Sequence, residues 1–444
     1  MKMQKAVMLL SGVCLTVSAA PPEVYTQRWR DPALNARIER NIEQYRKGDA
    51  VISVVDAAGN PVGGAKVAVQ QTGHEFLFGC NAFVLGQLTP AESEQRYESA
   101  FLQLFNFATV PFYWEGTEPE RGERRYAEPA RDIWRRPPPD RFLPWAAKHN
   151  LTLKGHPLLW HAYNPKWLPK DANELRALYQ KRFKEIASRF GDKLQVWDVV
   201  NESLVCNKAY PLYTPDRDYV RWAFKEVVPL FPADRIMMIN EVTSYNFPPA
   251  SQKYFDQIKS LQAQGATIRG IGFQYHYFRR AALDNFMKGA QCDPMKLLDV
   301  YEKFSEFNLP LYVTEITIPS AGEGGAELQA EVVRDHYRLW FAAPKMAGVT
   351  WWNLGDGTAV KGENEAQGGL LDADFKPKPA YTALDQLINR DWKTQATLTT
   401  DAQGQAKLHG FHGTYRVTIE QGGKTKQQTL PLKKTGDNKW AITL

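Results

Sequence analysis

The sequence is short of cysteine, of net charge and of long apolar runs, and each shortage argues against a class of protein. Its 444 residues hold four cysteines, none at metal-binding spacings, so neither a disulfide scaffold nor a cysteine-ligated metal site is expected. The formal net charge of +6 is too small and too scattered to indicate a nucleic-acid-binding surface. Beyond the first 20 residues, no segment is long and apolar enough to span a membrane.

The first 20 residues have the pattern of a secretory signal peptide. Lys2 and Lys5 give a positive start, an apolar run of 12 residues (AVMLLSGVCLTV) follows, and small residues suited to cleavage lie at 17–20. The apolar run is too short to cross a membrane comfortably. We therefore expect a secreted or periplasmic protein from which residues 1–20 are removed, which lowers the net charge to +4.

Three cysteines, Cys80, Cys206 and Cys292, remain after this cleavage. An odd number in an exported protein leaves at least one thiol free. The sequence leaves open whether Cys206 and Cys292 form a disulfide bridge.

Aromatic residues, in contrast, are plentiful: 13 Trp, 19 Tyr and 22 Phe make up 12% of the chain. They fit a large core or a cleft in which flat rings stack on sugars, and composition does not separate these readings.

The central part of the chain alternates short β-type runs with helix-type stretches. Near-continuous apolar strands between helices are typical of a parallel sheet that is buried on both faces. Eight such units predict an α/β protein with a (β/α)8 TIM barrel. An open doubly wound sheet is the alternative, but no glycine-rich phosphate loop follows the first strand. The eight runs begin at Leu77, Phe105, Leu151, Leu194, Arg235, Ile268, Pro310 and Gly348.

The two flanks of this region have short alternating strands and glycine turns instead. Residues 51–70 (VISVVDAAGNPVGGAKVAVQ) read as a β-hairpin around a DAAGNP turn, and residues 396–432 give several more strands. Together the flanks resemble the halves of one transthyretin-like or carboxypeptidase-regulatory-like module, which would be a small β-sandwich built from both chain ends. Two independent β-appendages are the alternative. The expected domains are a signal peptide (1–20), an N-terminal helical segment (21–47), the first half of the sandwich (48–75), the catalytic barrel (76–390) and the second half of the sandwich (391–444).

Two of the predicted barrel strands carry a glutamate near their carboxyl ends. Glu202 closes the run VWDVVNE, and Glu315 lies in LYVTE. In barrels of this kind the carboxyl ends of the strands form the mouth of the active site. Two facing carboxyl groups are what glycoside hydrolysis needs, one protonated and one ionised. The alternative is that each glutamate pairs with an arginine or caps the next helix.

Five motifs in chain order resemble glycoside hydrolase family 10, whose best-known members are retaining endo-β-1,4-xylanases. WDVVNE matches the acid/base motif of that family, and YVTEITI resembles its nucleophile strand, usually ITELDI. The other three are KGHPLLWHAYNPKWL at 154–168, GIGFQYH at 270–276 and LLDADFKPKPAY at 370–381. The resemblance covers roughly residues 76–390.

This resemblance implies a role for eight residues. Glu202 would be the general acid/base and Glu315 the nucleophile. Asn201 would bind the sugar 2-hydroxyl, and Gln274 and His276 would lie beside the nucleophile. The remaining predicted substrate-binding residues are His156, Trp160 and Trp352. The chemistry needs no metal and no cofactor. We expect a monomer that acts on a polysaccharide or oligosaccharide.

Several positions depart from the family pattern around this pair. The strand that usually reads TxENxMKW is ATVPFYWEGTEP here, so residues 110–113 replace a polar clamp by apolar and aromatic groups. Tyr163 and Tyr275 are further aromatic replacements, and the loop after Trp352 lacks the family's second tryptophan. The first hypothesis is retaining hydrolysis of β-1,4-xylosidic bonds in xylan or xylo-oligosaccharides. The alternatives are the same chemistry on a different or decorated β-glycoside, and a non-catalytic carbohydrate-binding barrel.

Overall fold

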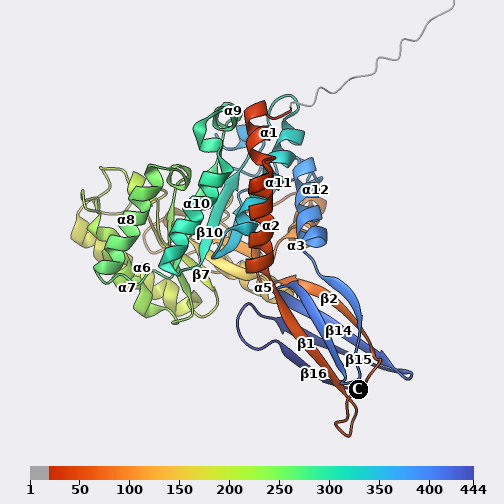
Figure 1. Cartoon of the computed structure of the whole chain (residues 1–444). Coiled ribbons are helices and arrows are strands. Elements are labelled where there is room, and N and C mark those ends of the chain that lie inside the picture. Colours follow the sequence, from red (N-terminus) through yellow and green to blue (C-terminus); the bar gives the residue numbers. More distant parts are fainter. Residues whose placement is uncertain (1–19) are drawn as a thin grey trace, which may run out of the picture.

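A computed structural model describes residues 20–444, which form a barrel wrapped in helices and a smaller β-structure at one end of it (Figure 1). The predicted signal peptide, apart from Ala20, lies outside the described residues. Among residues 20–444, no helix combines the length and the apolar character that a membrane span requires.

The barrel is a closed sheet of parallel strands. Its order is β5-β4-β3-β11-β10-β9-β8-β7-β6, and β5 also pairs with β7, which closes the ring. This closure excludes the open doubly wound sheet. The strands are β3 (Leu77–Asn81), β4 (Phe107–Pro111), β5 (Thr152–His156), the two-residue β6 (Leu159–Trp160), β7 (Val196–Asn201), β8 (Ile236–Glu241), β9 (Gly270–His276), β10 (Leu311–Thr317) and β11 (Met346–Trp351).

Each barrel strand is buried along almost its whole length because helices cover one face and packed side chains fill the other. All residues of β4, β7 and β10 are buried, which explains why these strands read as unbroken apolar runs. The helices along the barrel are α3 (Ala91–Leu104), α4 (Trp114–Thr117), α5 (Phe142–His149), α6 (Ala172–Phe190), α7 (Asp218–Val227), α8 (Ala250–Ala263), α9 (Arg280–Lys288), α10 (Pro294–Phe304), α11 (Gly325–Ala342) and α12 (Pro379–Gln386).

Two further helices precede the β-structure, α1 (Glu23–Trp29) and α2 (Pro32–Arg46). Asp31 caps α2, accepting hydrogen bonds from the N–H groups of Ala33 and Leu34. Leu34, Ile38 and Ile42 recur every fourth residue and bury one face of the helix. This face lies against the barrel beside α11. The C-terminal end of α2 runs directly into β1 (Figure 1).

The smaller β-structure is a sandwich of two sheets to which both flanks of the barrel contribute. One sheet has the order β13-β1-β16 and the other β12-β2-β14-β15. Their inner faces share one apolar core, which includes Ile52, Val67 and Trp440. The strands are β1 (Lys47–Val55), β2 (Lys66–His74), β12 (Gln395–Thr399), β13 (Gln405–Phe411), β14 (Gly413–Gln421), β15 (Lys424–Leu432) and β16 (Lys439–Thr443).

The predicted hairpin at residues 51–70 is wrong. β1 pairs with β13 and β16, whereas β2 pairs with β12 and β14. A hairpin would place the apolar residues of both strands on the same side of one sheet. Here Ile52 and Val67 face each other across the core from opposite sheets. Alternation alone fits both arrangements, so the sequence pattern did not distinguish them.

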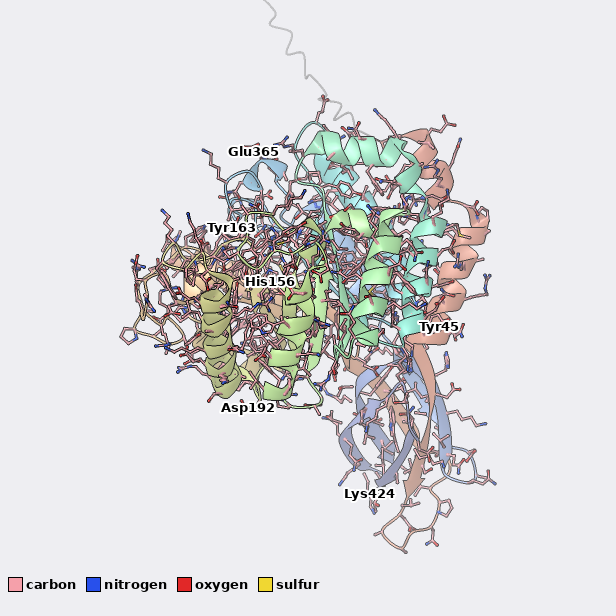
Figure 2. All side chains as sticks on the ribbon, turned by 90° about the vertical axis from the view of Figure 1, so that its left-hand side faces the viewer. Tyr45, His156, Tyr163, Asp192, Glu365 and Lys424 are labelled. Atoms are coloured by element: carbon pink, nitrogen blue, oxygen red, sulfur yellow. The ribbon has the colours of Figure 1, made fainter. Side chains whose placement is uncertain are left out.

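The sandwich lies at the end of the barrel where the strands begin, because β2 leads directly into β3. A cavity of about 320 Å³ at this junction is lined by residues from both parts, among them Arg46, His74 and Phe76. The predicted catalytic strand ends therefore point away from the sandwich, toward the opposite end of the barrel. In Figure 2, Tyr163 and Glu365 lie on that side and Lys424 lies in the sandwich.

Candidate active site

Glu202 follows β7 in a backbone conformation that few residues adopt. Its φ of 57° and ψ of 44° lie in the left-handed region, which costs a non-glycine residue about 1 kcal/mol or more. The N–H of Glu202 donates to the carbonyl of Asn240 at 2.8 Å. Just beyond it, the Ser203 hydroxyl and the Leu204 N–H donate to Glu241 at 2.7 and 2.9 Å. The end of β8 thus holds this strained turn at two points.

The Glu202 carboxyl is held by one neutral donor on each oxygen. Oε1 accepts from the Gln274 amide at 2.8 Å, and Oε2 accepts from the Trp160 indole N–H at 3.1 Å. Burial raises the pKa of Glu202, the Gln274 hydrogen bond opposes this in part, and the negative charge of Glu315 raises it further. This environment favours the protonated form of Glu202.

Glu315 lies within β10 and is 5% exposed. Its Oε1 accepts from the Asn240 amide at 3.1 Å, and its Oε2 lies 3.1 Å from Nε2 of His276. Burial raises the pKa of Glu315, and positive charge at His156 and Lys154 opposes the rise. The two carboxyl groups differ in their charged neighbours, because His156 and Lys154 oppose the rise of the pKa at Glu315 whereas the charge of Glu315 adds to the rise at Glu202.

A fully buried charged group supports the floor of the site. Asp198 Oδ2 accepts from Lys154 Nζ at 2.9 Å and lies 2.6 Å from His156 Nδ1. Burial alone would raise the pKa of Asp198, but Lys154 and His156 reverse this effect and lower it. The aspartate orients His156, whose Nδ1 also lies 3.9 Å from Glu315 Oε1.

His276 is fixed between Glu315 and a hydroxyl group. Its Nδ1 lies 2.9 Å from Thr317 Oγ1, and its Nε2 faces Glu315. Burial lowers the pKa of His276 to about 4, so the ring is neutral at neutral pH. A neutral ring carries one proton, and Nε2 can donate to Glu315 only if Nδ1 accepts from the Thr317 hydroxyl.

Asn240 joins the two predicted functional strand ends. Its amide nitrogen donates both to Asn201 Oδ1 at 2.8 Å and to Glu315 Oε1 at 3.1 Å, while its oxygen accepts from the Thr314 hydroxyl at 2.6 Å. Within the described residues, the amide nitrogen of Asn201 donates to no protein group, and Asn201 lines the cavity. That N–H group is available to a ligand.

Aromatic rings enclose the carboxyl pair. Trp352 packs edge-on against Phe83 and His156, with ring centroids 5.1 and 5.6 Å apart. Tyr113 contacts Phe83, His156 and Trp160 from the other side. These rings bound a cavity of about 190 Å³. The cavity is lined by all eight residues singled out from the sequence: His156, Trp160, Asn201, Glu202, Gln274, His276, Glu315 and Trp352.

In three details the structure differs from the arrangement that the sequence predicts or leaves open. Gln274 pairs in register with Glu315 on the neighbouring strand, yet its amide donates to Glu202. Tyr275, expected to alter the site, instead points outward and bonds to His336 on α11, because alternate strand residues face opposite sides. The sequence left open a bridge between Cys206 and Cys292; within residues 20–444 the structure forms none, and both are free and buried, as is Cys80.

Sequence reasoning missed several groups in and under the site: Lys154, Asp198, Asn240, Thr317, Arg135 and Arg136. A detectable signal existed for Lys154 and Asp198, because a lysine and an aspartate within buried apolar strands need each other as partners. The two arginines lie in a segment without strand or helix periodicity, and only their fold placement brings them to the cavity. Among residues 20–444, no cluster of His, Cys, Asp or Glu is suited to hold a metal ion.

The chain matches known proteins across the barrel. The family model "Glycosyl hydrolase family 10" matches residues 97–387. Endo-1,4-beta-xylanase B of Thermotoga neapolitana is 28% identical over 320 residues, which cover 67% of this chain and 85% of that protein. The anti-sigma-I factor RsgI6 of Acetivibrio thermocellus is 24% identical over 417 residues, or 92% of this chain, but the match spans 49% of its length.

Solved structures share the fold. Xylanase 10B from Thermotoga petrophila, crystallised with xylobiose, has a TM-score of 0.59 at 23% identity and covers 71% of this chain and 95% of its own. Xylanase 10B from Thermotoga maritima has a TM-score of 0.59 at 24% identity, and the match covers 71% of this chain and 96% of that one. The family model spans well over half of the chain, and the barrel carries the family's motifs at its strand ends. The chain therefore belongs to glycosyl hydrolase family 10, and it is a glycoside hydrolase that resembles the endo-1,4-β-xylanases.

Proposed function

We propose that the protein is a secreted retaining glycoside hydrolase that cleaves β-1,4-xylosidic bonds in xylan or xylo-oligosaccharides by double displacement. The observation that carries this proposal is that Glu202 and Glu315 lie in one cavity with different charged neighbours: the charge of Glu315 adds to the rise of the Glu202 pKa, whereas His156 and Lys154 oppose the rise of the Glu315 pKa. Unlike neighbours are what separate an acid from a nucleophile in a carboxyl pair.

In the proposed reaction Glu315 attacks the anomeric carbon while Glu202 protonates the leaving oxygen. A covalent glycosyl-enzyme forms and the leaving sugar departs. Glu202 then takes a proton from a water molecule, which attacks the anomeric carbon and breaks its bond to Glu315. His276 donates to Glu315 and keeps the attacking oxygen oriented. The unpaired N–H group of Asn201 is available to the sugar 2-hydroxyl, a contact that strengthens in the transition state.

The shape of the site differs on its two sides. The 190 Å³ cavity around Glu315 is small, and Tyr113 and Trp352 close it. A larger groove of about 510 Å³ is lined by the loops after Trp160 and after Glu202, including His161 and Tyr210. Because Glu202 protonates the leaving oxygen, this groove is the place for the leaving sugars. A small glycone cavity beside a roomy leaving-group side supports the second candidate function, the same retaining chemistry on a different or decorated β-glycoside.

The test uses the two carboxyl groups separately. Glu315→Ala should lose hydrolysis of aryl β-xylosides, and added azide should give only the α-configured glycosyl azide, because azide then enters from the face that Glu315 vacates. Glu202→Ala should keep the first step on substrates with good leaving groups and form the β-azide. Product configuration is read by proton NMR. A β-azide from Glu315→Ala would contradict the assignment. If the correctly folded wild type hydrolysed none of a panel of aryl glycosides, the result would favour a non-catalytic carbohydrate-binding barrel.

Export and oligomeric state complete the proposal. The segment 1–20 supports export to the periplasm or the medium, which N-terminal sequencing of the mature protein checks. We infer a monomer because the large apolar side chains exposed on the described surface, Trp134, Tyr163 and Val205, are few. Light scattering after size-exclusion chromatography should give one chain, and a stable dimer would contradict this.

A further inference from the structure

Two buried arginines line the active-site cavity. Arg135 and Arg136 belong to residues 118–138, between α4 and a short helix at Pro139–Arg141, and they are 3% and 8% exposed. Both side chains border the same 190 Å³ cavity as Glu202 and Glu315. Burying a guanidinium group is costly unless its charge and its donors meet a partner. Two adjacent ones beside a substrate cavity therefore call for a ligand.

Within residues 20–444, the hydrogen-bond acceptors of Arg135 are neutral. Its Nη1 donates to Asn353 Oδ1 at 2.5 Å and to the Thr358 carbonyl, while its buried Nε has no partner within the described residues. The nearest acid in this network, Glu363, accepts from the Asn353 amide at 3.0 Å, so a neutral amide stands between the two charges. Burial lowers the pKa of Arg135 to about 10, which leaves the group charged at neutral pH.

Within the described residues, Arg136 has one acidic neighbour, Glu115, at the edge of ion-pair distance. Its guanidinium carbon lies 3.8 Å from the centre of the Tyr113 ring, and its Nη1 donates to the carbonyl of Arg135 at 3.0 Å. The Nη2 atom lies 3.9 Å from Glu115, too far for a hydrogen bond, and Nε is buried without a partner in the described part of the chain. Arg136 thus stacks on Tyr113 while lining the cavity.

The arginines lie on the glycone side. Their contacts are Phe83 after β3, Tyr113 after β4, and Asn353 after β11. In the closed ring β11 lies opposite β7, which carries Glu202, and β3 lies beside β11, whereas β4 is separated from β7 by β5. The leaving sugar departs on the Glu202 side, so Arg135 and Arg136 face the sugars that remain on the enzyme. This is also the side where residues 110–113 lack the family's polar clamp.

We propose that Arg135 and Arg136 bind the carboxylate of a uronic acid carried by the glycone part of the substrate. The inference rests on the proposed function and names the substrate class of the same site. A guanidinium group is planar and matches a carboxylate with two parallel hydrogen bonds, which makes such pairs strong and selective. The acids that line the cavity, Glu202, Glu315 and Glu363, would repel an anion; protonation of Glu202 reduces that repulsion.

The test compares one sugar with and without its charge. The probes are a xylo-oligosaccharide with a glucuronic acid branch, the methyl ester of that compound, and a xylo-oligosaccharide that ends in glucuronic acid at its non-reducing end. The wild type should cleave the free acid at least tenfold faster in kcat/KM than the ester, which has nearly the same shape. The better of the two acidic probes identifies whether the uronic acid is a branch or a backbone unit.

Arg136→Gln should bring the ratio of acid to ester close to one, and Arg135→Lys should lower it. The matched control is Arg131→Gln, in the same segment, since Arg131 is exposed and pairs with Glu123 away from the cavity; it should keep both the ratio and the activity. A ratio near one in a wild type that cleaves both probes overturns the inference, as does an unchanged ratio in folded Arg136→Gln.

Calorimetry on the wild type separates this inference from the proposed function. If no probe is hydrolysed but the acid binds at least tenfold more tightly than the ester, the proposed function fails and the arginine site stands. If xylo-oligosaccharides are cleaved without regard to charge, and the acid and ester bind equally, the inference fails and the proposed function stands. Binding measured on the unmodified protein does not depend on whether a variant folds.

Discussion

At the scale of single residues, the site depends on which nitrogen of His276 carries the proton. Thr317 decides this, because its hydroxyl can donate to Nδ1 and leaves Nε2–H for Glu315. The family's nucleophile strand usually reads ITELDI, with an aspartate at the position of Thr317. An aspartate would accept from Nδ1 and favour a doubly protonated ring, whereas the threonine pairs with the neutral ring that burial imposes.

Thr317→Val removes this hydroxyl with little change in shape. We expect kcat/KM on aryl β-xylosides to fall about tenfold, since one hydrogen bond worth about 1.4 kcal/mol is lost in the transition state. Thr317→Ser should retain activity. The free energy of unfolding of both variants should lie within about 1 kcal/mol of the wild-type value. An unimpaired Thr317→Val, or a Thr317→Ser that is equally slow, would show that Thr317 does not position His276.

Glu202 and Glu315 could be found from the sequence because their position at strand ends is visible along the chain. Asn240 could not be assigned in the same way. Its partner lies on another strand, and only the register of the closed ring brings Asn240 to Glu315. The position of Arg135 and Arg136 in the site could not be predicted either, because a loop has no periodicity from which the direction of its side chains follows.

At the scale of elements, the eight barrel strands could be predicted because burial on both faces leaves an unbroken apolar run. The sandwich strands were recognisable too, but not their partners. Ile52 and Val67 alternate with polar residues in the same way in a hairpin and across two sheets. Local pattern fixes which face of a strand is apolar, and the fold decides which sheet it joins.

Helix α2 stabilises the barrel from outside the family's matched region. Ile38 is 2% exposed on its inner face, so Ile38→Ala should lower the free energy of unfolding by about 2–4 kcal/mol through lost burial and a cavity. Arg40→Ala, on the exposed face of the same helix, should change it by less than about 0.5 kcal/mol. Urea denaturation followed by tryptophan fluorescence measures both. Equal effects would mean that the α2 face does not pack against the barrel.

At the scale of the whole molecule, pH acts on stability through buried neutral histidines. His336 on α11 donates from Nδ1 to the Val332 carbonyl and accepts the Tyr275 hydroxyl at Nε2. Burial lowers its pKa to about 3, against about 6.5 when unfolded. Between these values the unfolded chain binds the extra proton, so the contribution of His336 is complete above about pH 6.5 and is lost as the pH falls.

His409 should behave in the opposite way. It lies on the sandwich surface, 2.6 Å from both Asp49 and Glu43, and these hydrogen bonds raise its pKa. Its contribution is present below about pH 6.5 and is lost as the pH rises through the pKa that His409 has in the folded state.

The two histidines are tested by urea unfolding at several pH values. Between pH 5 and pH 6.5, His336→Gln should flatten the rise of the unfolding free energy with pH by about 1.4 kcal/mol per pH unit. Comparing slopes cancels opposing groups such as Glu241, whose pKa burial raises to about 8. His409→Gln, measured from pH 5 to pH 8, should cost more stability at the acid end than at the alkaline end. If His336→Gln left the slope unchanged, protons would reach that ring in the folded state, and the packing of α11 against β9 would be looser than its full burial implies.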